Sequence, residues 1–464
     1  MPAPRRFHVR TYGCQMNEHD SERLAGLMVA DGLERAEEGA EADVVIFNTC
    51  TIRENADLKL YSALGHLKAE KERRPAMQIA VGGCMAQQER GRVLERAHWV
   101  DVVFGTHNLA SAPRLLERSR TEGPLVEVLD APDPEANRDM APALYAVRES
   151  PFAAWITIQT GCDNTCAYCI VPAVRGAEIS RPFDDLVAEA TMLAGTGVTE
   201  VTVLGQNVNS YGRDITRRRP LFAQLLRALG EVEGLERIRF TSPHPKDLRP
   251  ETIAAMAETP TVCPQLHLPL QSGSNRVLAA MRRGYTVERY LDRLGAARAA
   301  IPDLAVTTDL IVGFPGESDA EFDETLEVVA RCEFDSAYTF IFSPREGTRA
   351  ATMNDRFVGA DVIKERFERL KVVLDRSALR RHEARVGRRE EVLVEGPSRT
   401  NDATLSGRTR QGKLIHFPAG DEALRPGSLA MVDVLHGAPY HLLGEYSSTV
   451  RGPRHKVRIP LLSS

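Results

Sequence analysis

Residues 161–169 read Gly161-Cys162-Asp163-Asn164-Thr165-Cys166-Ala167-Tyr168-Cys169, a C-x3-C-x2-C triplet. The separations are too short for each cysteine to come from its own helix or strand, so we expect one loop to carry all three, with Gly161 giving the backbone freedom to turn. Three thiolates can bind three irons of a 4Fe-4S cube and leave the fourth iron open to a small molecule. A zinc site usually has a fourth Cys or His nearby, and none follows Cys169 closely. The spacing therefore favours a cluster over a zinc knuckle or ordinary buried thiols.

The region around this triplet, from Phe152 to about Leu379, alternates strand-like with helix-like runs. The expected strands are residues 155–158, 200–204, 237–240, 265–268, 305–311 and 336–341. Six βα units predict a parallel sheet curved into a partial (β/α)6 barrel, with its chemistry at the carboxyl ends of the strands. Polar clusters lie at those ends, at residues 205–209, 241–245, 271–275 and 313–317. Any one of them alone would be an ordinary turn.

A second group of cysteines lies nearer the N-terminus. Cys14, Cys50 and Cys84 each end an apolar, strand-like run and precede a helical pattern, at residues 17–30, 54–69 and 87–96. This repeated unit predicts a doubly wound parallel sheet, in which the loops at the carboxyl ends of the strands converge on one crevice. The three cysteines are then expected to share a site, the alternative being three independent core thiols. Cys263 and Cys332 have no partner spacing and are expected in the core.

The triplet, with Tyr168 before its last cysteine, resembles the signature of radical S-adenosylmethionine (SAM) enzymes. Two three-cysteine sites in this order resemble the methylthiotransferases, and the likeness extends over residues 12–17, 48–53 and 82–87. The resemblance implies two 4Fe-4S clusters: a radical-generating cluster that binds and cleaves SAM, on Cys162, Cys166 and Cys169, and an auxiliary cluster associated with sulfur, on Cys14, Cys50 and Cys84.

The same resemblance implies where SAM binds. Gly313 and Gly316 suit a loop whose backbone approaches a flat adenine, because glycine has no side chain to keep it away. The implied SAM-binding residues are Tyr168, Gly205, Gln206, Asn207, Ser242, Gln271, Gly313, Phe314, Gly316 and Glu317. Arg175 is expected either to pair with a carboxylate or phosphate near the cluster or to form a surface ion pair with Glu178.

The chain is expected to form an α/β protein with three domains. Short β-like runs after a long amphipathic helix over about 361–386 predict a small antiparallel barrel near the C-terminus, similar to the family's TRAM domain. Arg408, Arg410 and Lys413 surround a hairpin there and are candidates for RNA phosphate contacts, the alternative being a solvated hairpin. The expected divisions are an N-terminal methylthiotransferase domain (1–120), a proline-rich linker (121–150), a radical SAM domain (151–384), a TRAM RNA-binding domain (385–450) and a basic tail (451–464).

Bulk composition sets limits on the function. The chain has 464 residues and 43% hydrophobic residues, so it can bury large cores. Its net charge of −5 argues against a protein that coats nucleic acid nonspecifically, and it leaves room for a local basic patch. No apolar stretch is long enough to span a bilayer, and no apolar signal region follows the N-terminus. Eight cysteines without short-range disulfide spacing suit a reducing compartment, so we expect a cytoplasmic enzyme.

The resemblance points to tRNA as the substrate. Residues 266–274 resemble the groups of methylthiotransferases that act on tRNA, unlike the ribosomal group. Residues 205–211 and 341–348 are most similar to the group that modifies C2 of N6-isopentenyladenosine 3′ of the anticodon. Ala173 and Glu346 depart from that group, which often has an aromatic residue and a proline there. The resemblance implies use of two SAM, an electron donor protein and a sulfur source. The alternatives are the threonylcarbamoyl-adenosine enzymes, the ribosomal protein aspartate enzymes and an RNA-binding iron–sulfur redox protein.

Overall fold

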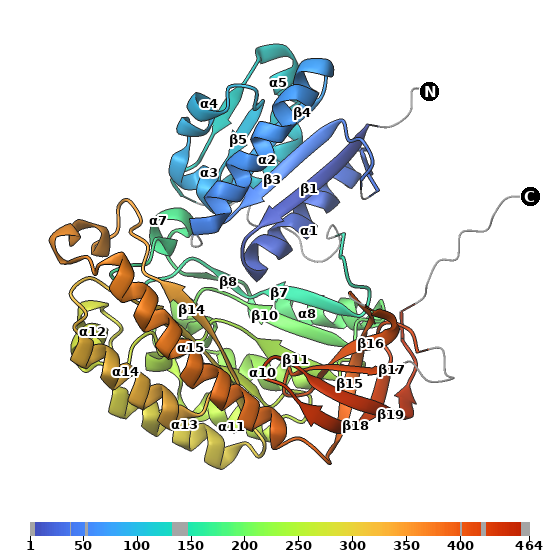
Figure 1. The fold of residues 1–464 in the computed structure, drawn as a ribbon. Helices are drawn as coiled ribbons and strands as arrows, with labels where there is room; N and C mark the ends of the chain where they lie inside the picture. Colours follow the sequence, from blue (N-terminus) through green and yellow to red (C-terminus); the bar gives the residue numbers. More distant parts are fainter. Residues whose placement is uncertain are drawn as a thin grey trace, which may run out of the picture. The chain divides into compact units, whose positions relative to one another are not determined.

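The computed structural model describes residues 5–37, 39–51, 54–131, 147–399, 401–418 and 424–455 (Figure 1). The chain divides into two compact units. The first contains residues 1–149, 160–164 and 169–179, and the second contains residues 150–159, 165–168 and 180–464. Half of the predicted linker (132–146) and most of the predicted basic tail (456–464) lie outside the described residues.

The first unit is built on a six-stranded sheet in the order β2-β1-β3-β4-β5-β6, with every neighbouring pair parallel. Its strands are β1 (Arg6–Tyr12), β2 (Glu34–Arg35), β3 (Val44–Thr49), β4 (Gln78–Gly83), β5 (Val102–Phe104) and β6 (Leu125–Glu127). Its helices are α1 (Gln15–Ala30), α2 (Glu54–Arg73), α3 (Cys84–Glu89), α4 (Arg92–Arg96), η1 (Thr106–Ser111), α5 (Ala112–Glu122) and α7 (Val171–Arg175).

Two separate apolar cores lie on the two faces of this sheet. Val45 and Phe47 pack in one core, whereas Val44 and Ile46 pack in the other. The apolar residues of β3 follow one another without polar interruptions because helices cover both faces of the strand. The prediction of a doubly wound parallel sheet is therefore confirmed. The helix expected over residues 87–96 is instead two short helices, and β6 extends the sheet into the segment expected to be linker.

The second unit begins with a half-barrel of parallel strands. β7 (Ala153–Thr157), β10 (Glu200–Leu204) and β11 (Arg237–Phe240) form one sheet, and β12 (Gln265–His267), β13 (Ala305–Val312) and β14 (Ser336–Ile341) form another. A bridge between Ile238 and Val262 lies next to the junction of the two sheets. All six strands match predicted ones, so the (β/α)6 partial barrel is confirmed. The short strands β8 (Gln159–Thr160) and β9 (Ile179–Ser180) pair with each other.

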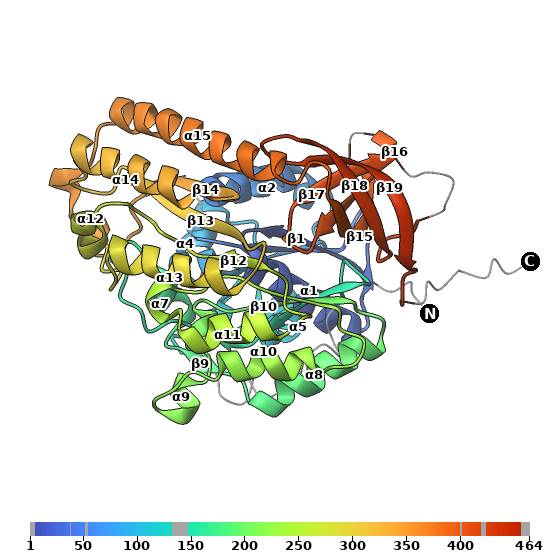
Figure 2. The ribbon, with the colours of Figure 1, turned by 90° about the horizontal axis from the view of Figure 1, so that it is seen from below.

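Helices cover the outside of this half-barrel (Figure 2). They bury apolar side chains such as Leu225, Leu294 and Phe322 against the strands, which leaves the loops at the carboxyl ends to carry polar residues. The main helices are α8 (Phe183–Gly195), α10 (Phe222–Gly230), α11 (Pro250–Glu258), α12 (Asn275–Ala280), α13 (Val287–Ala300), α14 (Asp319–Cys332) and α15 (Ala360–Glu383).

The C-terminal strands close a small barrel in the order β15-β16-β17-β19-β18. The strands are β15 (Arg389–Ser398), β16 (Asn401–Thr409), β17 (Leu414–Pro418), β18 (Leu429–Gly437) and β19 (Leu442–Arg451). All pairs are antiparallel except β17 with β19. Val392, Ile415, Phe417 and Val432 fill its core. The predicted small antiparallel barrel is confirmed, with that single parallel pair as an addition.

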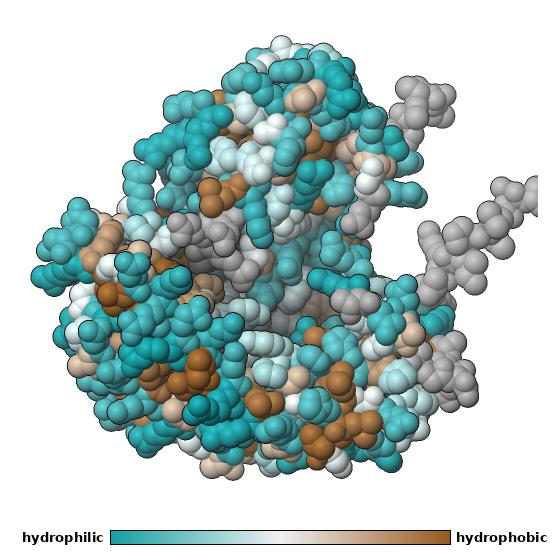
Figure 3. Space-filling model, in the orientation of Figure 1, coloured by the Kyte–Doolittle hydropathy of each residue, from teal (hydrophilic) through white to brown (hydrophobic). Residues whose placement is uncertain are grey.

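Hydrophilic side chains dominate the face in Figure 3, and apolar side chains reach it only in separate patches. Within the part of the chain that the structure describes, no helix is both long enough and apolar enough to cross a membrane.

Candidate cluster and cofactor sites

The N-terminal cysteines follow three neighbouring parallel strands. Cys14 comes directly before α1, Cys50 follows β3, and Cys84 is the first residue of α3. Because β1, β3 and β4 are parallel neighbours, their carboxyl ends meet at one edge of the sheet. The loops approach closely, since a Cβ added at Gly13 would lie 2.8 Å from Cβ of Cys50. The structure thus brings these three predicted residues to one place.

Local hydrogen bonds make one of these thiols acidic. The hydrogen bond from the Cys50 thiol lowers the pKa of Cys14 to about 6, against the opposing effect of burial. A low pKa favours the thiolate, which is the form that binds metal. Asn17 Nδ2 donates to Asn48 Oδ1 (3.2 Å) and to the carbonyl of Thr49 (3.2 Å), which ties α1 to the end of β3.

A buried arginine donates a hydrogen bond to the third thiol, that of Cys84. The Arg175 side chain is 7% exposed; its Nε donates to Cys84 Sγ at 3.3 Å, and its Nη2 donates to Asp20 Oδ2 at 2.7 Å. The guanidinium therefore pairs with a carboxylate beside the cysteines, and Asp20, not Glu178, is its acidic partner. A positive charge held there stabilises a thiolate on Cys84, whose pKa is otherwise raised by burial.

The central triplet lies on one loop, as its spacing predicts. Gly161 has φ +77°, and a Cβ there would overlap the carbonyl oxygen of Ala177, so the loop needs glycine at this position. The Cys162 amide donates to the carbonyl of Gly176 at 3.1 Å, and the Asn164 amide donates to Cys162 Sγ at 3.5 Å. Cys162 and Cys169 fall in the first unit and Cys166 in the second.

Cys166 also has a buried arginine beside it. Arg283 is 6% exposed; its Nη1 donates to Cys166 Sγ at 3.3 Å and its Nε to the Tyr285 hydroxyl at 3.2 Å. Tyr285 in turn donates to the carbonyls of Pro269 and Leu270, which fixes its ring. Among the described residues no carboxylate pairs with Arg283. A buried cation needs a compensating anion, and the thiolates of an iron–sulfur cluster supply one.

The donors of each group suit a 4Fe-4S cluster, because all three are cysteines and thiolates are the ligands that its irons take. A 4Fe-4S cube takes each thiolate on a different iron, so its ligands do not need to converge on one point. The buried arginines at Cys84 and Cys166 add the positive charge that a set of thiolates requires.

The predicted SAM residues lie at the carboxyl ends of the half-barrel strands, except Tyr168, which lies on the cysteine loop between β8 and α7. Asn207, after β10, is buried; its Nδ2 donates to Asp247 Oδ2 at 2.9 Å, and its carbonyl accepts from Gln159 Nε2 at 2.8 Å. The adjacent Gln206 Oε1 is buried without a hydrogen-bond partner in the structure. Ser242 and Gln271 both have left-handed backbones, with φ of 60° and 70°. Such strained backbones in non-glycine residues cluster at functional sites.

The loop over residues 313–317 turns sharply at two glycines. Gly313 and Gly316 both have φ +77°, and the Gly313 amide donates to Glu317 Oε2 at 3.0 Å. Arg366 Nη1 donates to the same oxygen at 2.9 Å, so the Glu317 carboxylate shapes the loop and anchors it to α15. The Phe314 ring is fully buried and packs edge-on against Phe342. The side chains of Glu317 and Phe314 therefore stabilise the shape of the loop, and binding of SAM by these residues stays a prediction.

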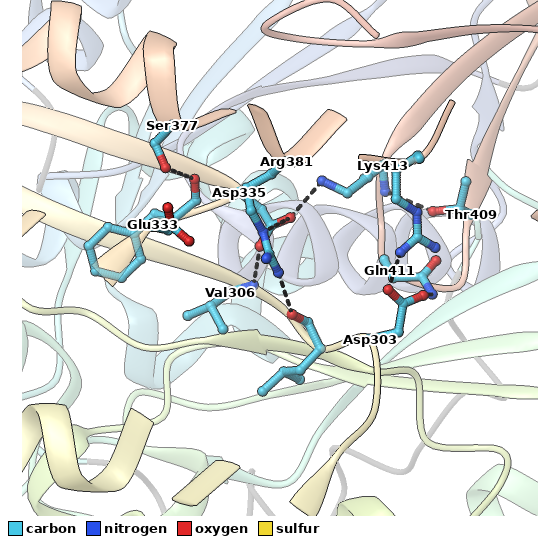
Figure 4. Close-up of polar contacts among 12 residues, drawn as sticks. Asp303, Val306, Glu333, Asp335, Ser377, Arg381, Thr409, Gln411 and Lys413 are labelled. Atoms are coloured by element: carbon cyan, nitrogen blue, oxygen red, sulfur yellow. Dashed lines mark hydrogen bonds and ion pairs between the residues drawn. The ribbon is translucent and has the colours of Figure 1, made fainter. Parts of the chain in front are cut away.

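Two of the three predicted RNA-binding side chains, those of Lys413 and Arg410, make contacts within the protein. Lys413 Nζ binds Asp335 Oδ1 at 2.6 Å (Figure 4), and the two side chains are only 4% and 5% exposed. Arg410 donates to the carbonyls of Glu236 and Pro260. The hairpin between β16 and β17 therefore docks on the half-barrel, and Lys413 does not face solvent. Arg408 remains exposed and pairs with Glu395 at 3.2 Å.

Two arginines of strand β11 in the half-barrel also donate hydrogen bonds to this hairpin. Arg237, fully buried, donates to the carbonyl of Arg408 at 2.8 Å and to Glu391 Oε1 at 2.9 Å. Arg239 donates to the carbonyls of Thr409 and Arg410, both at 2.9 Å. These contacts fix the small barrel to the ends of β11 and β12 that lie away from the predicted SAM loops.

Comparison with protein families identifies the class. Residues 6–105 match the model described as Uncharacterized protein family UPF0004, and residues 156–329 match the Radical SAM superfamily. A structure of TsrM from Kitasatospora setae, a radical SAM methyltransferase with cobalamin and a [4Fe-4S] cluster bound, has the same fold with a TM-score of 0.55. It is 13% identical, and the match covers 75% of this chain and 77% of that chain, so the likeness concerns the fold alone. Fold, cysteines and family models together define a radical SAM enzyme.

Curated relatives narrow the class to one family. The chain is 52% identical over 449 residues to the tRNA-2-methylthio-N(6)-dimethylallyladenosine synthase of Mycobacterium ulcerans, covering 95% of this chain and 84% of the relative. It is 53% identical over 451 residues to the synthase of the same name from Mycolicibacterium vanbaalenii, covering 95% and 88%. The chain belongs to the family of these synthases. Its cofactors are SAM and 4Fe-4S clusters, which confirms the predictions of family and cofactors.

Proposed function

We propose that this chain adds a methylthio group to C2 of N6-isopentenyladenosine (dimethylallyladenosine) 3′ of the tRNA anticodon. Two groups of three cysteines in one chain of this family carry the proposal, because each group includes a thiol that accepts a hydrogen bond from a buried arginine. One group would hold the radical-generating cluster (Cys162, Cys166, Cys169), and the other would hold the sulfur-carrying cluster (Cys14, Cys50, Cys84).

The bound groups and the protein have different tasks. When bound, one SAM with the first cluster would supply the chemistry that removes hydrogen from C2, and the second cluster and a second SAM would supply the sulfur and its methyl group. The residues of this chain would hold these groups in place. Arg283 and Arg175 each donate a hydrogen bond to one thiol of a cysteine group. The loops at the carboxyl ends of the half-barrel strands would supply polar contacts to SAM. Both arginines are buried, so each one reaches its cysteine from inside the fold.

The reaction needs further components. Reductive cleavage of SAM takes an electron, and each turnover consumes sulfur, so the proposal includes an electron donor protein and a sulfur source. A tRNA substrate supports a cytoplasmic location. The expected domain roles follow the same division, with the auxiliary site in the first unit and the small C-terminal barrel as an RNA-binding element.

The experiment that tests the assignment compares two cysteine variants in an anaerobic assay with reductant, SAM and isopentenylated tRNA. Cys50→Ala should retain SAM cleavage to 5′-deoxyadenosine and lose the methylthio nucleoside. Cys263→Ala, at a buried thiol that belongs to neither group, is the matched control and should retain the product. Full methylthio product from Cys50→Ala would refute the role of the N-terminal cysteines.

A further inference from the structure

A basic loop follows the predicted SAM residues at the end of β10. Residues 212–220 form a loop whose two ends lie close together, because the Leu221 amide donates to the carbonyl of Tyr211 at 2.6 Å. The Tyr211 ring is fully buried, and its hydroxyl donates to the carbonyl of Arg181 at 2.8 Å. The short helix α9 (Arg213–Thr216) lies in this excursion and projects past α8 in Figure 2.

Hydrogen bonds to one hydroxyl shape the tip of the loop. Thr216 Oγ1 accepts from the amides of Arg218 (3.3 Å) and Arg219 (3.0 Å) and donates to the carbonyl of Arg219 at 2.6 Å. Arg217 has a left-handed backbone with φ 62°. A tight turn thus presents Arg217, Arg218 and Arg219, and all three residues are exposed. A preformed turn loses little conformational entropy when it binds a partner.

The charges of this tip are not balanced inside the protein. Arg213, at the base, pairs with Asp247 at 2.7 Å, and Asp214 Oδ2 accepts from the Ser180 amide at 2.9 Å. Within the described parts of the chain, none of the three tip guanidiniums has an ion-pair partner. Three unpaired cations on one turn, in a chain of net charge −5, form a local site for an anionic partner.

The position of the loop indicates which anionic partner binds to it. Asp247 accepts hydrogen bonds from both Arg213 and Asn207, so the base of the loop is tied directly to the predicted SAM motif. An RNA whose adenosine reaches the carboxyl ends of the half-barrel strands carries its neighbouring phosphates past this loop. Arg410 and Lys413, two of the three hairpin residues predicted to contact RNA, instead make contacts within the protein.

We infer that Arg217, Arg218 and Arg219 bind phosphates of the tRNA substrate close to the modified nucleotide. The inference rests on the proposed function, since it takes tRNA as the substrate. Guanidinium groups suit this contact because their planar fork matches two phosphate oxygens. The contact supplies affinity and position, and it does not read the base sequence.

The test removes three charges at the loop and, separately, three elsewhere. The loop variant is Arg217→Gln/Arg218→Gln/Arg219→Gln, and the control is Lys364→Gln/Lys371→Gln/Arg376→Gln on α15, where the three cations are also exposed. Binding of isopentenylated tRNA to the cluster-loaded protein is measured over a series of salt concentrations, together with KM and kcat for methylthio transfer. Thermal unfolding of both variants checks that they fold.

The loop variant should bind tRNA roughly tenfold or more weakly at moderate salt, with a raised KM. Its plot of log affinity against log salt should flatten by about 0.7–0.9 for each phosphate that the variant no longer neutralises. The control should match the wild type. Equal weakening in both variants, or none in the loop variant, would overturn the inference. Unchanged tRNA binding with slower reduction by a protein electron donor would assign the loop to an acidic protein surface instead.

Failure of the proposed function would look different. In that case the wild-type protein itself would form no methylthio nucleoside on this tRNA. A wild type that modifies the tRNA, beside a loop variant with unchanged KM and salt dependence, would refute only the loop.

Discussion

The buried ion pair between Lys413 and Asp335 should determine how firmly the small barrel is attached. Both side chains are almost fully buried, with Nζ 2.6 Å from Oδ1, so loss of either partner leaves a charge in a place that water hardly reaches. Breaking such a pair typically costs about 3–5 kcal/mol. In Lys413→Met the Asp335 carboxylate keeps the Val306 amide at 2.8 Å and Arg381 at 3.5 Å, so we expect about 3 kcal/mol, the lower end.

The assay is chemical unfolding combined with limited proteolysis between α15 and β15. Lys413→Met should lower the unfolding midpoint and expose residues 384–388 to protease. Arg389→Met is the matched control: it breaks an ion pair with Asp433 in the same barrel whose side chains are 57% and 41% exposed. Exposed pairs contribute about 0–1 kcal/mol, so this variant should stay close to the wild type.

A double variant separates the charge from the packing. Lys413→Met/Asp335→Asn removes both charges, so its cost should be less than the sum of the two single costs, by about 1–3 kcal/mol. The reasoning is refuted if Lys413→Met is no more destabilising than Arg389→Met, or if the single costs simply add.

Three further changes have defined outcomes. Gly161→Ala should lower iron content while the fold of the N-terminal sheet persists, since its Cβ would overlap the Ala177 carbonyl; iron analysis with circular dichroism checks this. Arg283→Gln should make the reduction potential of the cluster at Cys166 more negative, because a nearby cation favours the reduced, more negative state; Arg283→Lys should restore it in EPR-monitored titration. Burial lowers the pKa of His382 to about 4, so the unfolded chain takes up a proton below pH 6.5 that the folded chain does not. Stability should therefore fall by about 1.4 kcal/mol from this group between pH 7.5 and 5.5, and His382→Gln should remove that part of the loss in unfolding measurements.

The elements of the fold were predictable because their signals are local. Apolar runs of strand length, each ending at a polar loop, located all six half-barrel strands, and Cys14, Cys50 and Cys84 followed from their repeated place after such runs. The break between α3 and α4 was missed, although Gly91 lies inside the expected helix. The strand β6 was missed because three residues are too few to show a periodicity.

The partners of the charged residues were not predictable, because they are distant in sequence. Arg175 lies 155 residues from Asp20, Arg283 lies 117 residues from Cys166, and Lys413 lies 78 residues from Asp335. A basic residue on a hairpin looks the same in sequence whether it faces RNA or docks on a neighbouring domain. Only the packing of the small barrel against β11 and β12 decides this, and it assigns Lys413 to docking.

The central claim is that this chain transfers a methylthio group to isopentenyladenosine in tRNA. The most direct measurement incubates the reconstituted, reduced wild-type protein with SAM and isopentenylated tRNA, then analyses the nucleosides by mass spectrometry. The account predicts a methylthio mass gain on that adenosine alone. Formation of 5′-deoxyadenosine without the gain, or a gain only on threonylcarbamoyl-adenosine or on a protein, would contradict it.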